Sequence, residues 1–487
     1  MLQRGLAAIP VAAFLLAIST SVQASVKISS KPTKNMSCSA GVCSPTAKNA
    51  VLNVGDLVNM LADGDVRVTC GRAAQDIEID AGIGWAGAAR LTLDAYHSIA
   101  FNKPVTVTGT GALTITTNDG GSGGDFQFFG KGHVEFWDLT GSLIVNGHTY
   151  ALVKSLGKLK KLVKHNIEGF YALAKSIDEA GHQYSGSPVA ALEGIFEGLG
   201  NSISNLAIDS DDQYVGLFGE LFSPGSIRNV RLLSVNINGF RDQQAVGSLV
   251  GFNHFGTVAN SSSTGIVSSS GTGSLTGGLV GLTELGTIER SQTSVSVSAS
   301  GNGSTAGGLV GLNDDGCAIW CAGELVESYA TGTVSGGSGA IVGGLVGENA
   351  NGIIENSYAM GSVSGGDDSF GGGLVGANSK GNENEFAVID SSYSTGAVSA
   401  AGGSTIGGLI GEDLVGSGTT NSYWDLDTSG IGDPSKGAGN IANDPGITGL
   451  TTEQFQSGLP AGFAPSVWGE NPTINGGFPY LLALQPN

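Results

Sequence analysis

Positive charge is scarce in this chain of 487 residues. Lysine and arginine number 22 against 42 aspartate and glutamate residues, so the formal net charge is −20. An acidic chain repels nucleic acid and anionic membrane surfaces, so we expect no nucleic-acid partner. Charged residues make up only 13% of the chain and hydrophobic residues 40%. This composition argues against disorder, which requires high charge and few apolar residues.

Long hydrophobic runs are also few. Arg4 precedes the apolar stretch Leu6–Ile18, and Val22-Gln23-Ala24 is typical of a small-residue cleavage site. Residues 1–24 are therefore predicted to be a signal peptide. The stretch is too short to indicate a membrane span, and no later run reaches spanning length. We expect a secreted or cell-surface protein without a transmembrane span, which could use an outer-membrane secretion partner.

Cysteine is rare, and export to an oxidising compartment permits disulfides. The five are Cys38, Cys43, Cys70, Cys317 and Cys321. Cys317 and Cys321 lie four residues apart in a predicted loop, so we suspect a local disulfide there. Cys38 could pair with Cys43 or with Cys70, which would leave one cysteine over. No second Cys or His pair stands at zinc spacing, so no metal site is predicted.

Glycine, by contrast, is abundant, with 81 residues, and much of it belongs to a repeat. The phrase Gly-Gly-Leu-Val-Gly occurs whole at 277–281, 307–311, 343–347 and 372–376, with looser copies at 215–219, 246–251 and 407–411. Successive closing glycines are 32, 30, 30, 36, 29 and 35 residues apart. A period in this range indicates a repeat architecture.

A second phrase accompanies the first, as in Glu-Ser-Tyr-Ala-Thr-Gly-Thr-Val-Ser at 327–335. It defines three columns of recurring residues. The first column includes Asn229, Asn260, Asn356 and Asn421; the second is Ser261, Ser291, Ser328, Ser357, Ser392 and Ser422; the third is Tyr329, Tyr358, Tyr393 and Tyr423. Because Asn tolerates the left-handed conformation, we expect the asparagines at a coil corner, with their amides bonded in an internal ladder.

These features predict an all-β fold, a parallel β-helix (solenoid) with N- and C-terminal capping segments and a short helical insertion. Stacked repeats would place Leu279, Leu309, Leu345, Leu374 and Leu409 in one apolar column, with about 4.8 Å between paired strands. A β-propeller is the main alternative, but its blades need about 40–45 residues each. The predicted division is 1–24 signal peptide, 25–150 N-terminal cap and first coils, 151–195 helical and basic insertion, 196–430 repeat β-helix and 431–487 C-terminal cap.

The flanking segments are less regular. Residues 25–50 are polar and are interpreted as a linker, and strands with period-two alternation follow to about Val153. Within 152–182, Leu156, Leu159 and Val163 recur near helical spacing, and 170–180 could form a second short helix. Five lysines between 154 and 164 could bind an acidic ligand, but a solvated helix covering the solenoid is the preferred interpretation. The proline-rich tail ends in the apolar stretch 478–482, which we expect to cover the open core.

Gly-Gly-Leu-Val-Gly followed by Asn-Ser-Tyr-Ala-x-Gly-x-Val-Ser resembles the GLUG repeat. That repeat occurs in bacterial secreted adhesins of the filamentous-haemagglutinin type and in some surface IgA-peptidase precursors. The resemblance covers residues 201–424 and implies a right-handed β-helix with an extracellular, adhesive or structural role. The His-Glu-x-x-His zinc site of the peptidase members is missing from this sequence.

The predicted recognition site is the insertion Asp314–Glu324, which lengthens one repeat to 36 residues. A disulfide between Cys317 and Cys321 would hold Trp320 out from the rod, and a rigid aromatic ring gives binding area at low entropic cost. The alternative is that Trp320 packs on the neighbouring coil. Asp314, Asp315 and Glu324 complete this speculative binding site.

No catalytic motif is identified. The acidic clusters at 209–212, 314–315 and 367–368 could hydrolyse a glycoside or bind Ca²⁺, but most such clusters are solvated turns. No cofactor other than possible Ca²⁺ is expected. The leading hypothesis is an adhesin-like protein that is not an enzyme and that binds host or environmental glycans or surface proteins. The alternatives are an extracellular polysaccharide lyase or hydrolase, and a purely structural spacer.

Overall fold

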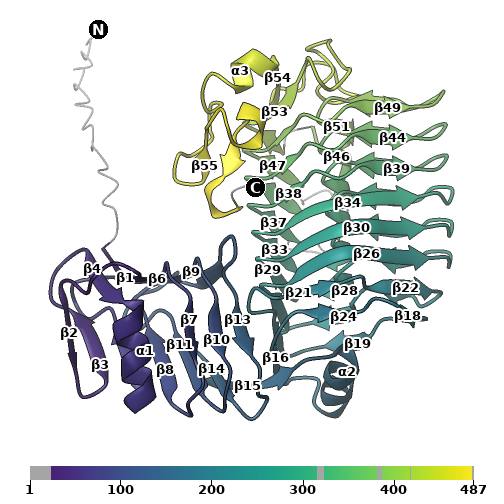
Figure 1. Cartoon of the computed structure of the whole chain (residues 1–487). Coiled ribbons are helices and arrows are strands. Elements are labelled where there is room, and N and C mark those ends of the chain that lie inside the picture. Colours follow the sequence, from purple (N-terminus) through teal and green to yellow (C-terminus); the bar gives the residue numbers. More distant parts are fainter. Residues whose placement is uncertain (1–23, 315–322, 381–386, 417, 485–487) are drawn as a thin grey trace, which may run out of the picture.

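The computed structural model describes residues 24–314, 323–380, 387–416 and 418–484, and these form a parallel β-helix in two arms (Figure 1). The N-terminal arm runs to about residue 145, and the C-terminal arm follows it. Strands of successive coils pair in parallel, as Thr257–Ala259 does with Thr287–Glu289. The predicted fold class is confirmed. Among the helices of these ranges, none is long and apolar enough to cross a membrane.

One long sheet, here called the spine, runs through both arms. Its strands, in order of pairing, are β2 (Met36–Ser39), β3 (Val42–Pro45), β5 (Val66–Thr69), β8 (Arg90–Asp94), β11 (Ala112–Thr116), β14 (Ser142–Val145), β15 (His148–Val153), β16 (Phe170–Leu173), β20 (Ile195–Glu197), β25 (Ser226–Arg228), β29 (Thr257–Ala259), β33 (Thr287–Glu289), β37 (Glu324–Val326), β42 (Ile353–Glu355), β47 (Val388–Asp390) and β52 (Thr419–Thr420).

The two arms meet where the spine reverses direction. Strands β14 and β15 pair antiparallel, whereas the strands on either side of them pair in parallel. The connection is Asn146-Gly147, and both residues have positive φ, 46° and 83°. This dipeptide is the commonest signal for a two-residue hairpin, because both positions must adopt left-handed conformations. We call this junction the elbow; the sequence analysis predicted one continuous stack and missed it.

Two further sheets close the N-terminal arm. They are β12 (Phe126–Phe128), β9 (Ile99–Phe101), β6 (Asp76–Ile79), β1 (Ser25–Ser29) and β4 (Ala50–Asn53) in the first, and β13 (Val134–Phe136), β10 (Val105–Val107) and β7 (Ile83–Trp85) in the second. Residues 25–50, which we interpreted as a linker, therefore belong to strands β1–β4. Alternate residues such as Val26 and Ile28 are fully buried, so the polar composition of this segment concealed a period-two core pattern.

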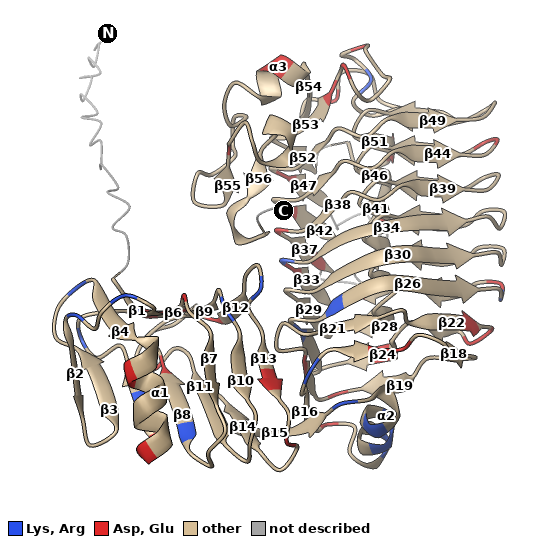
Figure 2. Ribbon diagram, viewed as in Figure 1, with Lys and Arg blue, Asp and Glu red and all other residues tan. Residues whose placement is uncertain are grey.

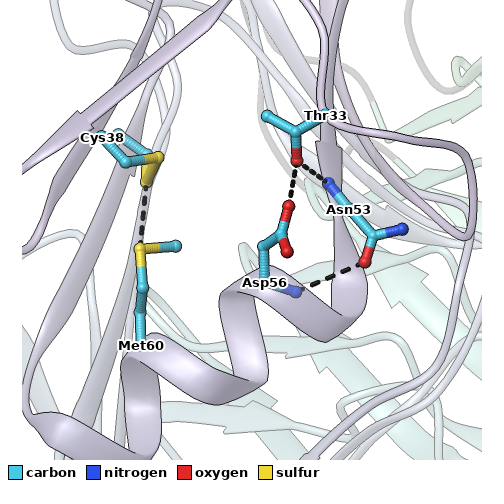
Figure 3. The surroundings of a disulfide bond; sticks show 6 residues. Thr33, Cys38, Asn53, Asp56 and Met60 are labelled. Atoms are coloured by element: carbon cyan, nitrogen blue, oxygen red, sulfur yellow. Dashed lines mark hydrogen bonds between the residues drawn. A yellow bond between two sulfur atoms is a disulfide. The ribbon is translucent and has the colours of Figure 1, made fainter.

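A helix that the sequence analysis missed covers the front of this arm. Helix α1 (Val54–Asp63) follows Asn53, whose side-chain oxygen accepts from the N–H of Gly55 and from that of Asp56, the latter bond being drawn in Figure 3. This is the usual N-cap arrangement. Beside it, Cys38 and Cys43 form a disulfide, and the Cys43 sulfur lies 3.9 Å from that of Met60. Cys70 is the cysteine left over, and it is buried.

The C-terminal arm adds three sheets to the spine. The first, which we call the tyrosine sheet, contains β17 (Ile177–Asp178), β21 (Ser202–Ser204), β26 (Arg231–Gly239), β30 (Ser262–Ser269), β34 (Gln292–Ala299), β38 (Tyr329–Ala330), β43 (Tyr358–Ala359), β48 (Tyr393–Ser394), β53 (Ser422–Asp425) and β54 (Ile447–Leu450), with β18 (Gln183–Tyr184), β22 (Ala207–Ser210), β39 (Val334–Gly336), β44 (Val363–Gly365) and β49 (Val398–Ala400) beside this path.

The other two sheets carry the Gly-Gly-Leu-Val-Gly phrase. They are β19 (Val189–Leu192), β24 (Phe218–Phe222), β28 (Val250–His254), β32 (Val280–Glu284), β36 (Val310–Asp314), β41 (Val346–Ala350), β46 (Val375–Ser379) and β51 (Ile410–Asp413), and β23 (Tyr214–Val215), β27 (Ala245–Val246), β31 (Leu275–Gly277), β35 (Thr305–Gly307), β40 (Ile341–Gly343), β45 (Phe370–Gly372) and β50 (Thr405–Gly407). The predicted leucine column is confirmed, since all five leucines are fully buried and successive members are joined by backbone hydrogen bonds.

The serine column forms the side-chain ladder at the corner. The hydroxyl of Ser291 donates to the carbonyl of Glu289 and accepts from the N–H of Ser261 in the preceding coil, and Ser328, Ser357 and Ser392 repeat this pattern. The asparagine column does have positive φ, from 45° to 56°, as predicted. Its amides do not form the predicted internal ladder: the side-chain oxygen of Asn260 accepts from Gln127, and that of Asn356 accepts from the indole of Trp468. A buried amide ladder exists elsewhere, from Asn313 through Asn349 to Asn378.

The helical insertion is shorter than expected. Helix α2 (Leu156–His165) buries Leu156, Leu159 and Val163 and exposes its lysines, which agrees with the solvated interpretation (Figure 2). Residues 170–180, for which we predicted a second short helix, form strands β16 and β17 instead. Tyr171 and Leu173 extend the core of the C-terminal arm, so pairing with the spine overrides the local helical tendency.

The tail packs on the side of the C-terminal arm. After β54 come α3 (Thr452–Phe455) and the antiparallel pair β55 (Trp468–Gly469) and β56 (Tyr480–Leu481). Phe455, Trp468 and Leu481 form a separate apolar cluster with the tyrosine column. The stretch 478–482 therefore covers the tyrosines rather than the open end of the core, where Ile431, Ala438 and Ile447 lie.

Candidate functional site

The predicted insertion lies partly outside the described residues. Asp315, Cys317, Trp320 and Cys321 belong to 315–322, so the suspected disulfide and the projecting ring remain predictions. The residues on either side of this segment are described. Asp314 ends β36 and forms an isolated antiparallel β-bridge with Asn351, and Glu324 begins β37 and is exposed.

The other acidic clusters do not converge. Asp209 accepts from Asn238 at 2.7 Å, and Asp211 and Asp212 are exposed in the turn that follows β22. Asp367 and Asp368 are exposed in a turn after β44. Across the residues with assigned positions, no three His, Cys, Asp or Glu side chains gather in a way that could hold a metal ion.

One column of residues on the tyrosine sheet is contacted by parts of the chain that are far apart in sequence. Register places one residue of each coil in line along the arm: Ser202, Arg231, Ser262, Gln292, Tyr329, Tyr358, Tyr393 and Tyr423. The first half of the column is polar and the second half aromatic. The tyrosine rings stack, with centroids 4.6 Å and 5.0 Å apart from Tyr329 to Tyr358 to Tyr393. The aromatic half of this column was predicted from the sequence, and its polar half was not.

Two different segments cover the two ends of this column. The C-terminal tail packs on the tyrosines (Figure 1), and Gln127 and Phe128 of β12 in the N-terminal arm line a cavity together with Arg231. Between them, Ser262 and Gln292 line a small cavity of about 90 Å³ that we call the notch. Its other lining residues include Gln127, Phe128 and Phe129 from the N-terminal arm, Asn229, Arg231 and Asn260 from the corner, and Leu484 from the tail.

Arg231 is held without a carboxylate partner. Its guanidinium donates to the carbonyl oxygens of Gly200 and Gly130, the latter at 3.3 Å. Its Nε is buried and has no acceptor among the described residues. Burial lowers the pKa of Arg231, because no nearby anion offsets the cost of removing the charge from water. The positive charge at the notch is therefore uncompensated.

A second, more open cavity lies on the other side of the corner. This groove, of about 430 Å³, is lined by Asn118, Gly124, Asp125, Asn146, Arg228 and Arg290, among others. Asp125 forms an ion pair with Arg228 across the two arms, and Arg290 lies 3.9 Å from the same carboxylate oxygen. Arg290 also pairs with Glu289 at 2.6 Å. The groove and the notch together make the elbow a polar, donor-rich surface.

A buried carboxylate lies behind Arg228. Glu197 is 1% exposed, and its side chain accepts from the N–H of Leu199 at 2.9 Å. Burial raises the pKa of Glu197 to about 7, although Arg228 and the Leu199 N–H act in the opposite direction. For Arg228, burial lowers the pKa, but the charges of Asp125 and Glu197 outweigh this effect and raise it. Arg228 is thus paired, while Arg231, three residues further on, is not.

One feature of the sequence indicates the elbow. Asn146-Gly147 between alternating strands indicated the hairpin. Residues 201–424 contain four arginines and one lysine, and Arg228, Arg231 and Arg290 gather at the elbow. Their clustering could not be predicted, because their distances depend on how the N-terminal arm folds back against the corner.

Comparison with protein families finds the GLUG motif, matched at residues 242–268 and 338–364. Each match spans most of one coil of the C-terminal arm, from β27 into β30 and from β40 to β44. The chain therefore carries GLUG repeats on a parallel β-helix.

Among characterised proteins, halomucin of Haloquadratum walsbyi (strain DSM 16790 / HBSQ001) is 41% identical over 81 residues. The match covers 16% of this chain and 1% of halomucin.

Two solved structures are similar in part. One is a Bacteroides ovatus protein provisionally named an immunoglobulin A1 protease, with 18% identity, coverage of 69% of this chain and 93% of that one, and a TM-score of 0.43. The other is named an IgA1 protease, with 20% identity, coverage of 60% and 23%, and a TM-score of 0.42. The strand pairing described above, rather than these distant likenesses, defines the fold.

Proposed function

We propose that this chain is a secreted, surface-associated β-helical protein of the adhesin type, and that it attaches to glycans at its elbow without catalysing a reaction. The observation that carries the proposal is the density of hydrogen-bond donors there. Four buried side-chain nitrogens there have no acceptor in the described chain: the Nε of Arg228, Arg231 and Arg290, and the amide nitrogen of Asn260. Buried donors normally have partners, and sugar hydroxyl and carboxylate oxygens are suitable acceptors.

The surroundings suit a polymeric ligand. The groove is open and lies between two arms, so a chain can pass through it rather than end in it. Amides and small residues of the N-terminal arm line one wall, and Phe128 and Phe129 line the neighbouring notch. The GLUG repeats and the segment similar to halomucin support a place at the cell surface.

An extracellular polysaccharide lyase or hydrolase is the second candidate, and Glu197 is the observation that favours it. A carboxyl group with a pKa of about 7 is in the range of a general acid at neutral pH. Glu197 does not line the groove or the notch, which argues for the binding function, because a substrate oxygen must come within hydrogen-bond distance of a catalytic acid. The two carboxylates that line the groove are both paired, Asp125 with Arg228 and Glu289 with Arg290.

The test measures retention and turnover together. The purified full chain is passed over a panel of immobilised polysaccharides and also assayed for new reducing ends and unsaturated products. We expect retention on at least one polysaccharide and no product. Arg290→Gln should weaken retention several-fold, whereas Lys161→Gln, which removes the same charge from the exposed face of α2, should not. Product release, or no retention on any polysaccharide, would contradict the proposal.

A further inference from the structure

The notch differs from the groove in one respect that bears on ligand chemistry. In the groove, Arg228 and Arg290 share the carboxylate of Asp125, and Arg290 has Glu289 as well. At the notch, no carboxylate of the described chain lies within 4.0 Å of the Arg231 guanidinium, which contacts only carbonyl oxygens. The chain has 42 acidic residues, so an arginine left without a carboxylate at a partly buried position is unusual here.

The position of Arg231 is fixed by the backbone around Gly200. Its guanidinium is fixed by the carbonyl of Gly200, a residue with a φ of +72°. A side chain at Gly200 would meet the ring of Phe128 at 2.7 Å and the carbonyl of Gly132 at 2.8 Å. Glycine is therefore required for both the backbone conformation and the close approach of the two arms. The arrangement holds the charge at the seam of the arms.

A second donor is presented to the same cavity. The side-chain oxygen of Asn260 accepts from Gln127 at 3.4 Å, a contact between the two arms. With its oxygen so engaged, the amide nitrogen is the free end, and it is buried without an acceptor in the described residues. Asn260 and Arg231 both line the notch, so a cationic donor and a neutral donor face one small space.

We infer that the notch recognises a carboxylate, and that the glycans bound at the elbow are uronate-containing polymers. This inference rests on the proposed glycan-binding function and adds the acidic group to it. The carboxylate would accept from Arg231 and Asn260, since a guanidinium edge matches the two oxygens of a carboxylate. The adjoining sugar ring would contact Phe128 or Phe129, while the rest of the polymer follows the open side of the elbow. A cavity of about 90 Å³ suits a carboxylate group and not a whole sugar ring.

The test compares three polymers at about 150 mM NaCl, where repulsion from the acidic chain is screened beyond about 8 Å. The probes are polygalacturonate, its carboxyl-reduced neutral form, and dextran sulfate. We expect the full chain to bind polygalacturonate most tightly. Arg231→Gln should weaken that binding about ten-fold and leave the neutral form unaffected. Arg241→Gln removes the same charge from an exposed position that follows β26 and should change nothing.

Asn260→Asp provides an independent variant if Arg231→Gln does not fold. It places a carboxylate at a corner with a φ of 50°, which aspartate tolerates, and should repel polygalacturonate while sparing the neutral polymer. Equal binding of all three polymers, or of polygalacturonate and dextran sulfate, would overturn the carboxylate assignment and leave the proposed function standing. Retention of none of the polymers in this set or in the wider panel would overturn both.

Discussion

The two arms are both stacks of β-helical coils, but their coils differ in length and in whether the sequence repeats. In the N-terminal arm, paired residues of adjacent coils such as Ile77 and Ile99 are 22 residues apart, and three sheets close the coil. In the C-terminal arm, Thr257 and Thr287 are 30 apart, and four sheets close it. Only the longer coils repeat their residues from one turn to the next. Sequence repetition is therefore one way of stacking coils, and alternating burial with parallel pairing is sufficient without it.

The tyrosine column should give the largest effect, because the N-terminal arm has no equivalent. Tyr358 is fully buried between Tyr329, Tyr393 and Trp468. Tyr358→Ala should cost about 3–5 kcal/mol of the free energy of unfolding and loosen the tail. Chemical denaturation and limited proteolysis after about residue 450 measure the two effects.

A matched pair of milder substitutions sharpens this prediction. The hydroxyl of Tyr358 is buried without a partner in the described residues, whereas that of Tyr393 donates to the carbonyl of Pro479 at 2.6 Å. Tyr358→Phe should be neutral or stabilising, and Tyr393→Phe should cost about 1 kcal/mol. The reverse order would contradict the hydrogen bonding described for these two hydroxyl groups.

The glycine phrase should give the next largest effect. A Cβ at Gly344 would lie 2.1 Å from the carbonyl oxygen of Gly373 in the next coil, so Gly344→Ala must push two coils apart. We expect a loss of about 3 kcal/mol in unfolding free energy. Gly303→Asn is the control, because that glycine has a φ of 61° and no atom within 4 Å of an added Cβ. Equal melting temperatures for the two variants would argue against the tight stacking.

The pH dependence of stability tests the elbow, where the two arms depend on each other. Burial raises the pKa of Glu197 from 4.5 in the unfolded chain to about 7 in the folded one. The folded state therefore holds this proton more tightly, and the stability it contributes is full below pH 4.5 and lost as pH rises through 7. The free energy of unfolding should therefore fall between pH 4.5 and pH 8, and Glu197→Gln should reduce this fall by about 1–3 kcal/mol, as measured by denaturation at a series of pH values. An unchanged slope would exclude Glu197 as its source.

The smallest effect is expected for one step of the serine ladder. Ser291 donates to Glu289 and accepts from Ser261, so Ser291→Ala should cost about 1 kcal/mol. Ser294 lies three residues further on, within β34, and is exposed, so Ser294→Ala should have no measurable effect. A loss at Ser294 equal to that at Ser291 would mean that the ladder contributes nothing specific.

What could be predicted from the sequence follows the same division between the arms. The leucine, serine and tyrosine columns recur at fixed spacing, so their stacking could be inferred before any coordinates. Helix α1 and the strands of residues 25–50 carry no repeat, and the predictions failed there or were not made. The asparagine amides were assigned to a ladder because a column of identical residues suggests one. In the structure Asn260 and Asn356 bond to side chains from other segments, and the serines form the ladder.

The candidate site was less predictable than the fold for a related reason. Repetition reports on contacts between neighbouring coils, whereas the notch joins the N-terminal arm, the corner and the tail. Gln127 meets Asn260 and Leu484 only because Asn146-Gly147 reverses the spine. Nothing in the periodicity of either arm specifies that meeting.

The notch can be completed only late in synthesis or export of the chain. Its lining includes Gln127 from the first third of the chain and Leu484 from the last few residues that the structure describes. A polypeptide that emerges from a ribosome or a membrane pore N-terminus first completes the N-terminal arm and the early coils long before the tail arrives. The cavity is then incomplete throughout synthesis and export. A protein built this way would become able to hold its ligand only after the segment that carries Leu484 had emerged.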